Sequence, residues 1–228
     1  MRDFLLVSAA ILPGLLVSYA IVRADRYERE PMWLLGLCFV LGGAVTVPAV
    51  WIERQALLAW GYPPKDALEA AVLSFGALAP IEELAKWLVV VLVAFPSRDF
   101  NEPMDGIVYA VLIAMGFASV ENVVYADRLG LRILLVRTLT AVPAHLAFAI
   151  VQGYYVGKAQ SEVSHRFRPL LQGLILATLL HGLYDLLVLQ GWSRWLVVLG
   201  VAALYPYLYF LSGLIRRYQE RSPFRPDK

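Results

Sequence analysis

The stretch Pro80-Ile81-Glu82-Glu83-Leu84-Ala85-Lys86 places two carboxylates and an amine inside an apolar run that extends from Ala70 to Phe95. The run is long enough to cross a bilayer, because a spanning helix needs about 20 mainly apolar residues. An ionisable group at bilayer depth costs at least about 2.5–3.5 kcal/mol, so three such groups require compensation from partners or from function. Glu82 and Glu83 lie four and three positions before Lys86, and on a helix both reach its amine. This helix therefore supplies its own counter-ion.

Pro80 adds an irregularity two residues before the first carboxylate. Proline removes a backbone donor and predicts a kink. Irregular backbone at membrane depth is tolerated only against protein or a water-filled cavity. We therefore expect a cavity beside Glu82.

The composition identifies an integral membrane protein. The chain has 228 residues, of which 60% are hydrophobic and 17% charged, and its mean hydropathy is +0.64. These values are far more apolar than those of a soluble domain. The net charge of +2 argues against nucleic-acid binding, and a single cysteine, Cys38, excludes an internal disulfide.

Seven apolar stretches are long enough to span the membrane, which predicts an all-α, polytopic bundle. They are Phe4–Val22, Met32–Ile52, Ala70–Phe95, Asp105–Ala126, Ile133–Val156, Leu170–Leu189 and Trp195–Ile215. The stretch Glu53–Leu68 fits an interfacial segment or a short re-entrant helix, which would be an eighth helical piece. We expect one transmembrane domain over residues 1–215 and a basic cytoplasmic tail over 216–228.

Positive charges in the connections predict the orientation, because cytoplasmic loops carry the excess of lysine and arginine. The side that includes the C-terminus collects twelve of these residues and the opposite side six. We therefore expect the N-terminus outside and the C-terminus in the cytoplasm.

Four of the seven predicted spans carry ionisable residues well away from their ends. Besides the third span, these are Glu121 in the fourth, Arg137 and His145 in the fifth, and His181 and Asp185 in the sixth. Although these spans alternate in direction, their polar groups fall at similar depths, between the middle of the membrane and its outer face. Glu121 shares a helix face with Phe117 and Tyr125, and His181 lies one turn before Asp185. Gly153 and Gly157 in the fifth span have a spacing that favours close helix contact.

These residue types point to the activation of water. A glutamate can polarise water, a second acid can supply a proton, and histidines can stabilise an oxyanion or bind a metal. Glu121, His145 and His181 form a reasonable zinc-ligand set. A metal-free site, in which Glu82 or Glu83 activates water, satisfies the same residues. No serine or cysteine stands at a recognisable spacing from a histidine, and no H-E-x-x-H motif is present.

Other interpretations of these residues remain open. Glu83 with Lys86, and Glu121 with Arg137, could be ion pairs that only fix helix packing, and Tyr125 could be a wall of the site. A transporter or proton-coupled channel would use the same carboxylates and histidines as a relay, but no inverted repeat is visible. A membrane receptor would keep the bundle without needing Glu82.

Three motifs together resemble the PrsW family of intramembrane proteases. They are E-E-x-x-K at 82–86, F-x-x-x-E-x-x-x-Y at 117–125 and H-x-x-x-D at 181–185, in this order on successive spans. Further similarity lies in Asp25-Arg26-Tyr27-Glu28-Arg29-Glu30-Pro31, in Asp105-Gly106-Ile107-Val108-Tyr109, and in His145 followed by Gly153-Tyr154-Tyr155-Val156-Gly157-Lys158. The match runs from the first loop through the sixth span.

The resemblance implies a multi-pass protease of the bacterial plasma membrane. It implies cleavage of a single-span anti-sigma factor near its extracytoplasmic face, which releases a sigma factor in an envelope stress response. It also implies distant kinship with the CAAX prenyl endopeptidases. The family's paired glutamates match Glu82 and Glu83, and its H-x-x-x-D histidine matches His181. The resemblance leaves zinc dependence open, and the expected partners are the substrate and membrane lipid.

Overall fold

The computed structural model of the chain describes residues 2–226, and every regular element within that range is a helix. The prediction of an all-α membrane bundle is confirmed, since six helical segments are long and apolar enough to cross a membrane. The helices are α1 (Arg2–Ala24), α2 (Met32–Trp60), α3 (Ala67–Leu73), η1 (Ser74–Leu78), α4 (Ala79–Val89), η2 (Val90–Ala94), α5 (Pro103–Leu129), α6 (Leu131–Leu139), α7 (Ala141–Ser161), η3 (Val163–His165), α8 (Phe167–Leu189) and α9 (Arg194–Arg221). The protein is a multi-pass membrane protein.

The predicted third span is a continuous helical path that changes its winding twice. The segments α3, η1, α4 and η2 follow one another from Ala67 to Ala94, and both η1 and η2 are π-helical. Pro80 is the second residue of α4, and the residue before it, Ala79, donates its N–H to the carbonyl of Ser74 in η1. Proline has no N–H to donate, and π turns are frequent at functional sites. The irregularity expected next to Glu82 is therefore the wider π-helical turn η1, which precedes Pro80 in the chain.

The end of the second predicted span differs from the structure. Helix α2 continues to Trp60, so the proposal of a separate interfacial or re-entrant piece over Glu53–Leu68 is wrong. The helix ends at Gly61, whose φ of 88° is a conformation that suits glycine. Helix α3 then begins at Ala67, where the Asp66 carboxylate accepts from the N–H of Glu69 at 2.9 Å.

The predicted fifth span is two helices, α6 and α7, separated at Thr140. Pro143 causes the break, because a proline ring clashes with the carbonyl four residues earlier. That residue is Leu139, the last of α6. Its carbonyl instead accepts a hydrogen bond of 2.6 Å from the Tyr205 hydroxyl. The break thus lies a turn before the proline that produces it.

Helix α5 is the centre of the bundle. In the most apolar part of α5, 83% of residues are buried, against 11% in α9. Close approach of neighbouring helices requires glycine: a Cβ on Gly106 would collide with the backbone of Gly153 on α7, and one on Gly157 with the carbonyl of Pro103. The close contact expected from the glycine spacing is therefore present, and it joins α7 to α5.

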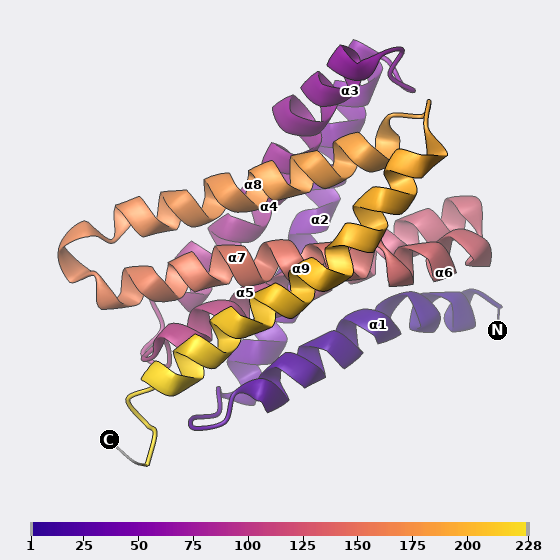
Figure 1. The fold of residues 1–228 in the computed structure, drawn as a ribbon. Coiled ribbons are helices and arrows are strands. Elements are labelled where there is room, and N and C mark those ends of the chain that lie inside the picture. Colours follow the sequence, from indigo (N-terminus) through magenta and orange to yellow (C-terminus); the bar gives the residue numbers. More distant parts are fainter. Residues whose placement is uncertain (1, 227–228) are drawn as a thin grey trace.

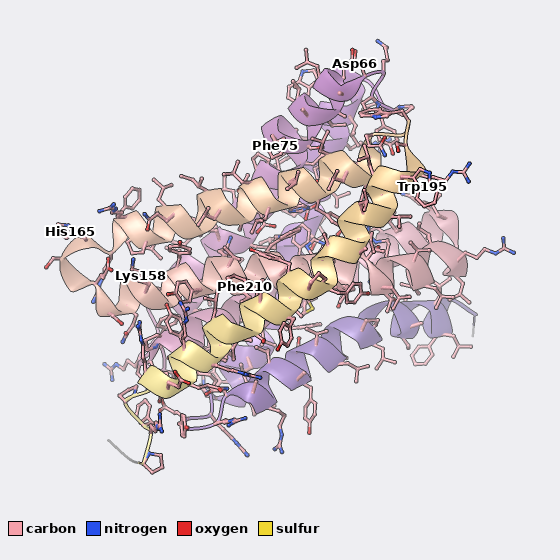
Figure 2. All side chains as sticks on the ribbon, in the orientation of Figure 1. Asp66, Phe75, Lys158, His165, Trp195 and Phe210 are labelled. Atoms are coloured by element: carbon pink, nitrogen blue, oxygen red, sulfur yellow. The ribbon has the colours of Figure 1, made fainter. Side chains whose placement is uncertain are left out.

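The connections between the long helices lie at the ends of the bundle (Figure 1), and its flanks carry exposed apolar side chains. Figure 2 shows Lys158 and His165 near the turn between α7 and α8, and Asp66 and Trp195 toward the other ends of the helices. Exposed side chains on the flanks include Leu92 and Phe210, at 68% and 69% exposure, as contact with lipid requires. Helix α9 extends past the predicted end at Ile215 to Arg221, and residues 227–228 of the predicted tail lie outside the described range. The boundary between domain and tail stays a prediction.

Candidate active site

All six predicted catalytic residues lie in one connected cluster. The cluster draws Glu82 and Glu83 from α4, Glu121 from α5, His145 from α7, and His181 and Asp185 from α8. The first five are at most 8% exposed, and the Asp185 side chain is 15% exposed. Burial of this many ionisable groups is tolerated only when they pair with one another or bind a further ligand.

Glu83 is fully engaged by its neighbours. Its Oε1 accepts from Lys86 Nζ at 2.5 Å and from His181 Nδ1 at 2.8 Å. Its Oε2 lies 3.5 Å from the amide nitrogen of Gln152. Glu83 therefore holds a lysine on its own helix and a histidine on α8 in fixed positions.

Glu82, the adjacent carboxylate, is much less engaged. Its Oε2 lies 3.6 Å from Lys86 Nζ and 4.0 Å from His181 Nε2. This oxygen is buried without a hydrogen-bond partner among the described residues. A buried carboxylate oxygen without a partner calls for a ligand or a reacting group beside it. Of the two glutamates, Glu82 is the one available for chemistry.

Glu121 is held by a cation and a histidine. Its Oε2 lies 2.8 Å from Arg137 Nη2 and 3.0 Å from His145 Nε2. Arg137 is itself fixed, since its Nε donates to Asn122 at 2.9 Å and its guanidinium lies 4.0 Å from the centre of the Tyr125 ring. Arg137 thus contacts both the Glu121 carboxylate and the Tyr125 ring.

The two histidines face different partners. Lys86 Nζ lies 3.4 Å from His145 Nδ1, so the ring accepts there and Nε2 donates to Glu121. His181 donates through Nδ1 to Glu83, which leaves Nε2 facing Asp185 Oδ2 at 3.5 Å. The Phe148 ring stacks on His181 with centroids 4.7 Å apart. These tautomers are assigned from the hydrogen-bond partners, and they leave His181 Nε2 free to take a proton.

Three ligand atoms of the cluster lie close enough together to hold a metal ion. One atom each from Glu82, Glu121 and His145 lies within 4.8 Å of the other two. The set expected from the sequence contained His181 in place of Glu82, but His181 is turned toward Glu83. Two carboxylates and an imidazole are suitable ligands for zinc, and the buried, unpartnered oxygen of Glu82 fits such a site.

A cavity of about 180 Å³ adjoins the cluster between α2 and α5. Its lining includes Glu53, Arg54, Glu121, Tyr125 and Arg128 but not Glu82. The sequence predicts a cavity beside Glu82, but the cavity in the structure borders the cluster at Glu121. It joins the buried carboxylates to the end of the bundle that carries Arg54 and Arg128.

Sequence reasoning missed four residues of the site. They are Glu53, Asn122, Phe148 and Gln152. Gln152 lies within the predicted fifth span, and Asn122 directly follows Glu121, so the sequence identifies both as polar residues in apolar surroundings. Phe148 could not be separated from ordinary packing residues. The sequence places Glu53 in the connection after the second span, because that span is predicted to end at Ile52.

Comparison with known proteins gives a consistent result. The model of a family described as PrsW family intramembrane metalloprotease matches residues 30–211. "Protease PrsW" of Geobacillus kaustophilus is 36% identical over 87% of this chain and 85% of its own length. The protein of the same name from Bacillus subtilis is 33% identical over 96% of this chain and 97% of its own length. The one from Clostridioides difficile is 32% identical over 83% of this chain and 81% of its own length. No solved structure matches the chain.

Proposed function

The chain belongs to the PrsW family of intramembrane metalloproteases, and we propose that this membrane peptidase cuts a single-span anti-sigma factor near its extracytoplasmic face. The cut would release a sigma factor in an envelope stress response. The observation that carries the proposal is the cavity that joins Glu121 to the end of the bundle with Arg54 and Arg128. In the orientation favoured by the loop charges, with the N-terminus outside, this end faces the exterior of a bacterial plasma membrane.

A metal ion fits the centre of the proposed site. Glu82, Glu121 and His145 would hold it, and zinc agrees with this donor set. Bound zinc lowers the pKa of water and polarises a carbonyl. His145 Nε2 donates to Glu121 in the structure, so it has to give up that proton to act as a ligand.

The remaining residues of the site handle protons and position their neighbours. His181 Nε2 takes the proton of the attacking water and delivers it to the amine that leaves. Asp185, 3.5 Å from this nitrogen, stabilises the imidazolium formed in between. Glu83, Lys86 and Gln152 keep His181 in place, and Arg137 keeps Glu121 in place.

Cleavage in liposomes tests the proposal. Wild type would be incubated with single-span anti-sigma factors, beside His181→Ala and a His165→Ala control, which alters an exposed histidine. We expect wild type and the control to cut near the outer face and His181→Ala not to cut. If His181→Ala cuts as fast as wild type, the proposed proton transfer is wrong. If wild type cuts other single-span proteins but no anti-sigma factor, the peptidase stands and the substrate assignment fails.

A further inference from the structure

A second group of buried acids lies far from the active site. We call Asp25, Glu30, Glu102 and Asp105 the acidic cluster. Two of them belong to the connection between α1 and α2, and two to the start of α5. On α5, about 24 Å of helix axis separates Asp105 from Glu121, at 1.5 Å per residue. The acidic cluster is therefore distinct from the active site, at the other end of the same central helix.

Three members of the acidic cluster converge on one point. One carboxylate oxygen each from Asp25, Glu102 and Asp105 lies within 4.8 Å of the other two. The three residues are 6%, 1% and 0% exposed. Asp105 is fixed there, because its Oδ2 accepts from the backbone N–H of Asn101 at 2.7 Å and of Glu102 at 2.8 Å. This geometry is held by the backbone at the start of α5.

Each of these three side chains keeps an oxygen without a partner. Asp25 Oδ2, Glu102 Oε2 and Asp105 Oδ1 are buried and have no hydrogen-bond partner among residues 2–226. Glu30 extends the pattern: one of its oxygens accepts from the Tyr109 hydroxyl, while Oε1 is buried without a partner. Orphaned buried oxygens are expensive, and four in one place indicate that something positive belongs among them.

The local charge points the same way. Burial and the neighbouring carboxylates of Glu102, Asp105 and Glu28 raise the pKa of Asp25 to about 7. Burial also raises the pKa of Glu30 to about 7. A cation between the carboxylates would remove this repulsion.

We propose that Asp25, Glu102 and Asp105 bind a divalent hard cation of the Mg²⁺, Ca²⁺ or Mn²⁺ class, at a site separate from the catalytic centre. Carboxylate oxygens without imidazole or thiolate are the ligands that such ions prefer. The ion ties the end of α1 to the start of α5. Helix α9 meets the same place, where Gln219 donates to the Ala24 carbonyl. The site therefore fastens three helices at the end of the bundle where α1 and α9 both end (Figure 1).

Mn²⁺ serves as a paramagnetic probe of the purified full chain in nanodiscs. Free and bound Mn²⁺ would be counted by electron paramagnetic resonance in wild type, Asp25→Asn and Asp99→Asn. Asp99 is the matched control, since it precedes Glu102 by three residues and accepts a hydrogen bond from Ser97. We expect Asp25→Asn to weaken Mn²⁺ binding about tenfold or more and Asp99→Asn to leave it unchanged. Mg²⁺ or Ca²⁺ should compete with the bound Mn²⁺ and raise the melting temperature of wild type.

His145→Ala separates this site from the catalytic centre. We expect His145→Ala to retain one Mn²⁺ site, and Glu102→Gln to lose it. If Asp25→Asn and Glu102→Gln both bind Mn²⁺ like Asp99→Asn, the proposal is overturned. Should Asp25→Asn fail to fold, the number of Mn²⁺ ions bound by folded His145→Ala decides. One bound Mn²⁺ supports the proposal, and the absence of bound Mn²⁺ refutes it.

Discussion

The two ends of α5 hold buried carboxylates in opposite ways. Glu121 is balanced by groups of the chain itself, with Arg137 Nη2 at 2.8 Å and His145 Nε2 at 3.0 Å. Asp105 is held by two backbone N–H groups and faces further carboxylates, among them Glu30. A protein can therefore keep a buried acid by supplying a counter-ion or by leaving room for one from solution. The difference predicts how each end responds to mutation, to ions and to pH.

Metal removal should have the largest effect on activity, and this loss of activity belongs to the catalytic end of α5. We expect a strong chelator to abolish cleavage completely and Zn²⁺ to restore it, because the ligand set at Glu82, Glu121 and His145 contains an imidazole. Mg²⁺ should not restore it, since Mg²⁺ prefers oxygen ligands. Cleavage rates and metal content before and after chelation provide the measurement. Cutting by demonstrably metal-free protein would contradict a metal-dependent site.

Replacement of each of the two adjacent glutamates should distinguish a residue needed for catalysis from one needed for stability of the fold. Glu82→Gln should lower kcat/KM by about 10²–10⁴-fold or more while the protein stays folded, because its Oε2 has no protein partner to lose. Glu83→Gln should lower activity and also destabilise the fold, since Lys86 would lose its closest counter-ion. Glu220→Gln, an exposed residue of α9, is the control. Cleavage kinetics beside melting curves measure both effects; equal melting of the two variants would count against the division of roles.

Removal of Arg137 should leave Glu121 as an uncompensated buried charge. Breaking a buried ion pair from one side costs about 3–5 kcal/mol. We therefore expect Arg137→Met to shorten the half-life of the folded protein in detergent. Arg132→Met on α6, an exposed arginine, should change it little. A half-life equal to that of wild type would show that the pair at Glu121 contributes nothing to stability.

The pH dependence should be the smallest effect, and it belongs to the acidic cluster. The pKa of Asp25 rises from 3.8 to about 7 in the folded chain, so the folded protein binds this proton more tightly than the unfolded one. Its contribution to stability is therefore lost as the pH rises from about 4 to about 7. In chelator, we expect wild type to melt a few degrees lower at pH 7.5 than at pH 5.5. Asp25→Asn should flatten this slope and Asp99→Asn should not; parallel slopes in all three proteins would rule out Asp25 as the source.

Local features of the sequence predict local features of the structure. The apolar runs identify the spans, because membrane thickness fixes their length. The spacing of Glu82, Glu83 and Lys86 predicts their contact within one helix. Because Glu121, His145 and His181 lie at similar depths in the membrane, the sequence also predicts that they form one cluster. These inferences need only helix geometry and the bilayer.

Contacts between distant segments could not be predicted in the same way. Whether Glu83 or Glu82 faces His181 depends on the rotation of α4 about its axis, which the π turn before Pro80 changes. Gln152 reaches Glu83 only because α7 lies deep in the bundle. Asp25 and Asp105 are 80 positions apart, and their convergence depends on how α1 packs against α5. Each case requires a rotation or a packing angle that no local pattern encodes.

The glycine contact between α5 and α7 limits how the catalytic site can open. At Gly106 and Gly153 the two backbones touch with no side chain between them, so neither helix can roll or slide without collision. Glu121 and His145 sit on these two helices, 3.0 Å apart, so we expect their separation to change little when the site opens. Glu82 and His181 lie on α4 and α8, and widening of the site to admit a polypeptide falls to these two helices.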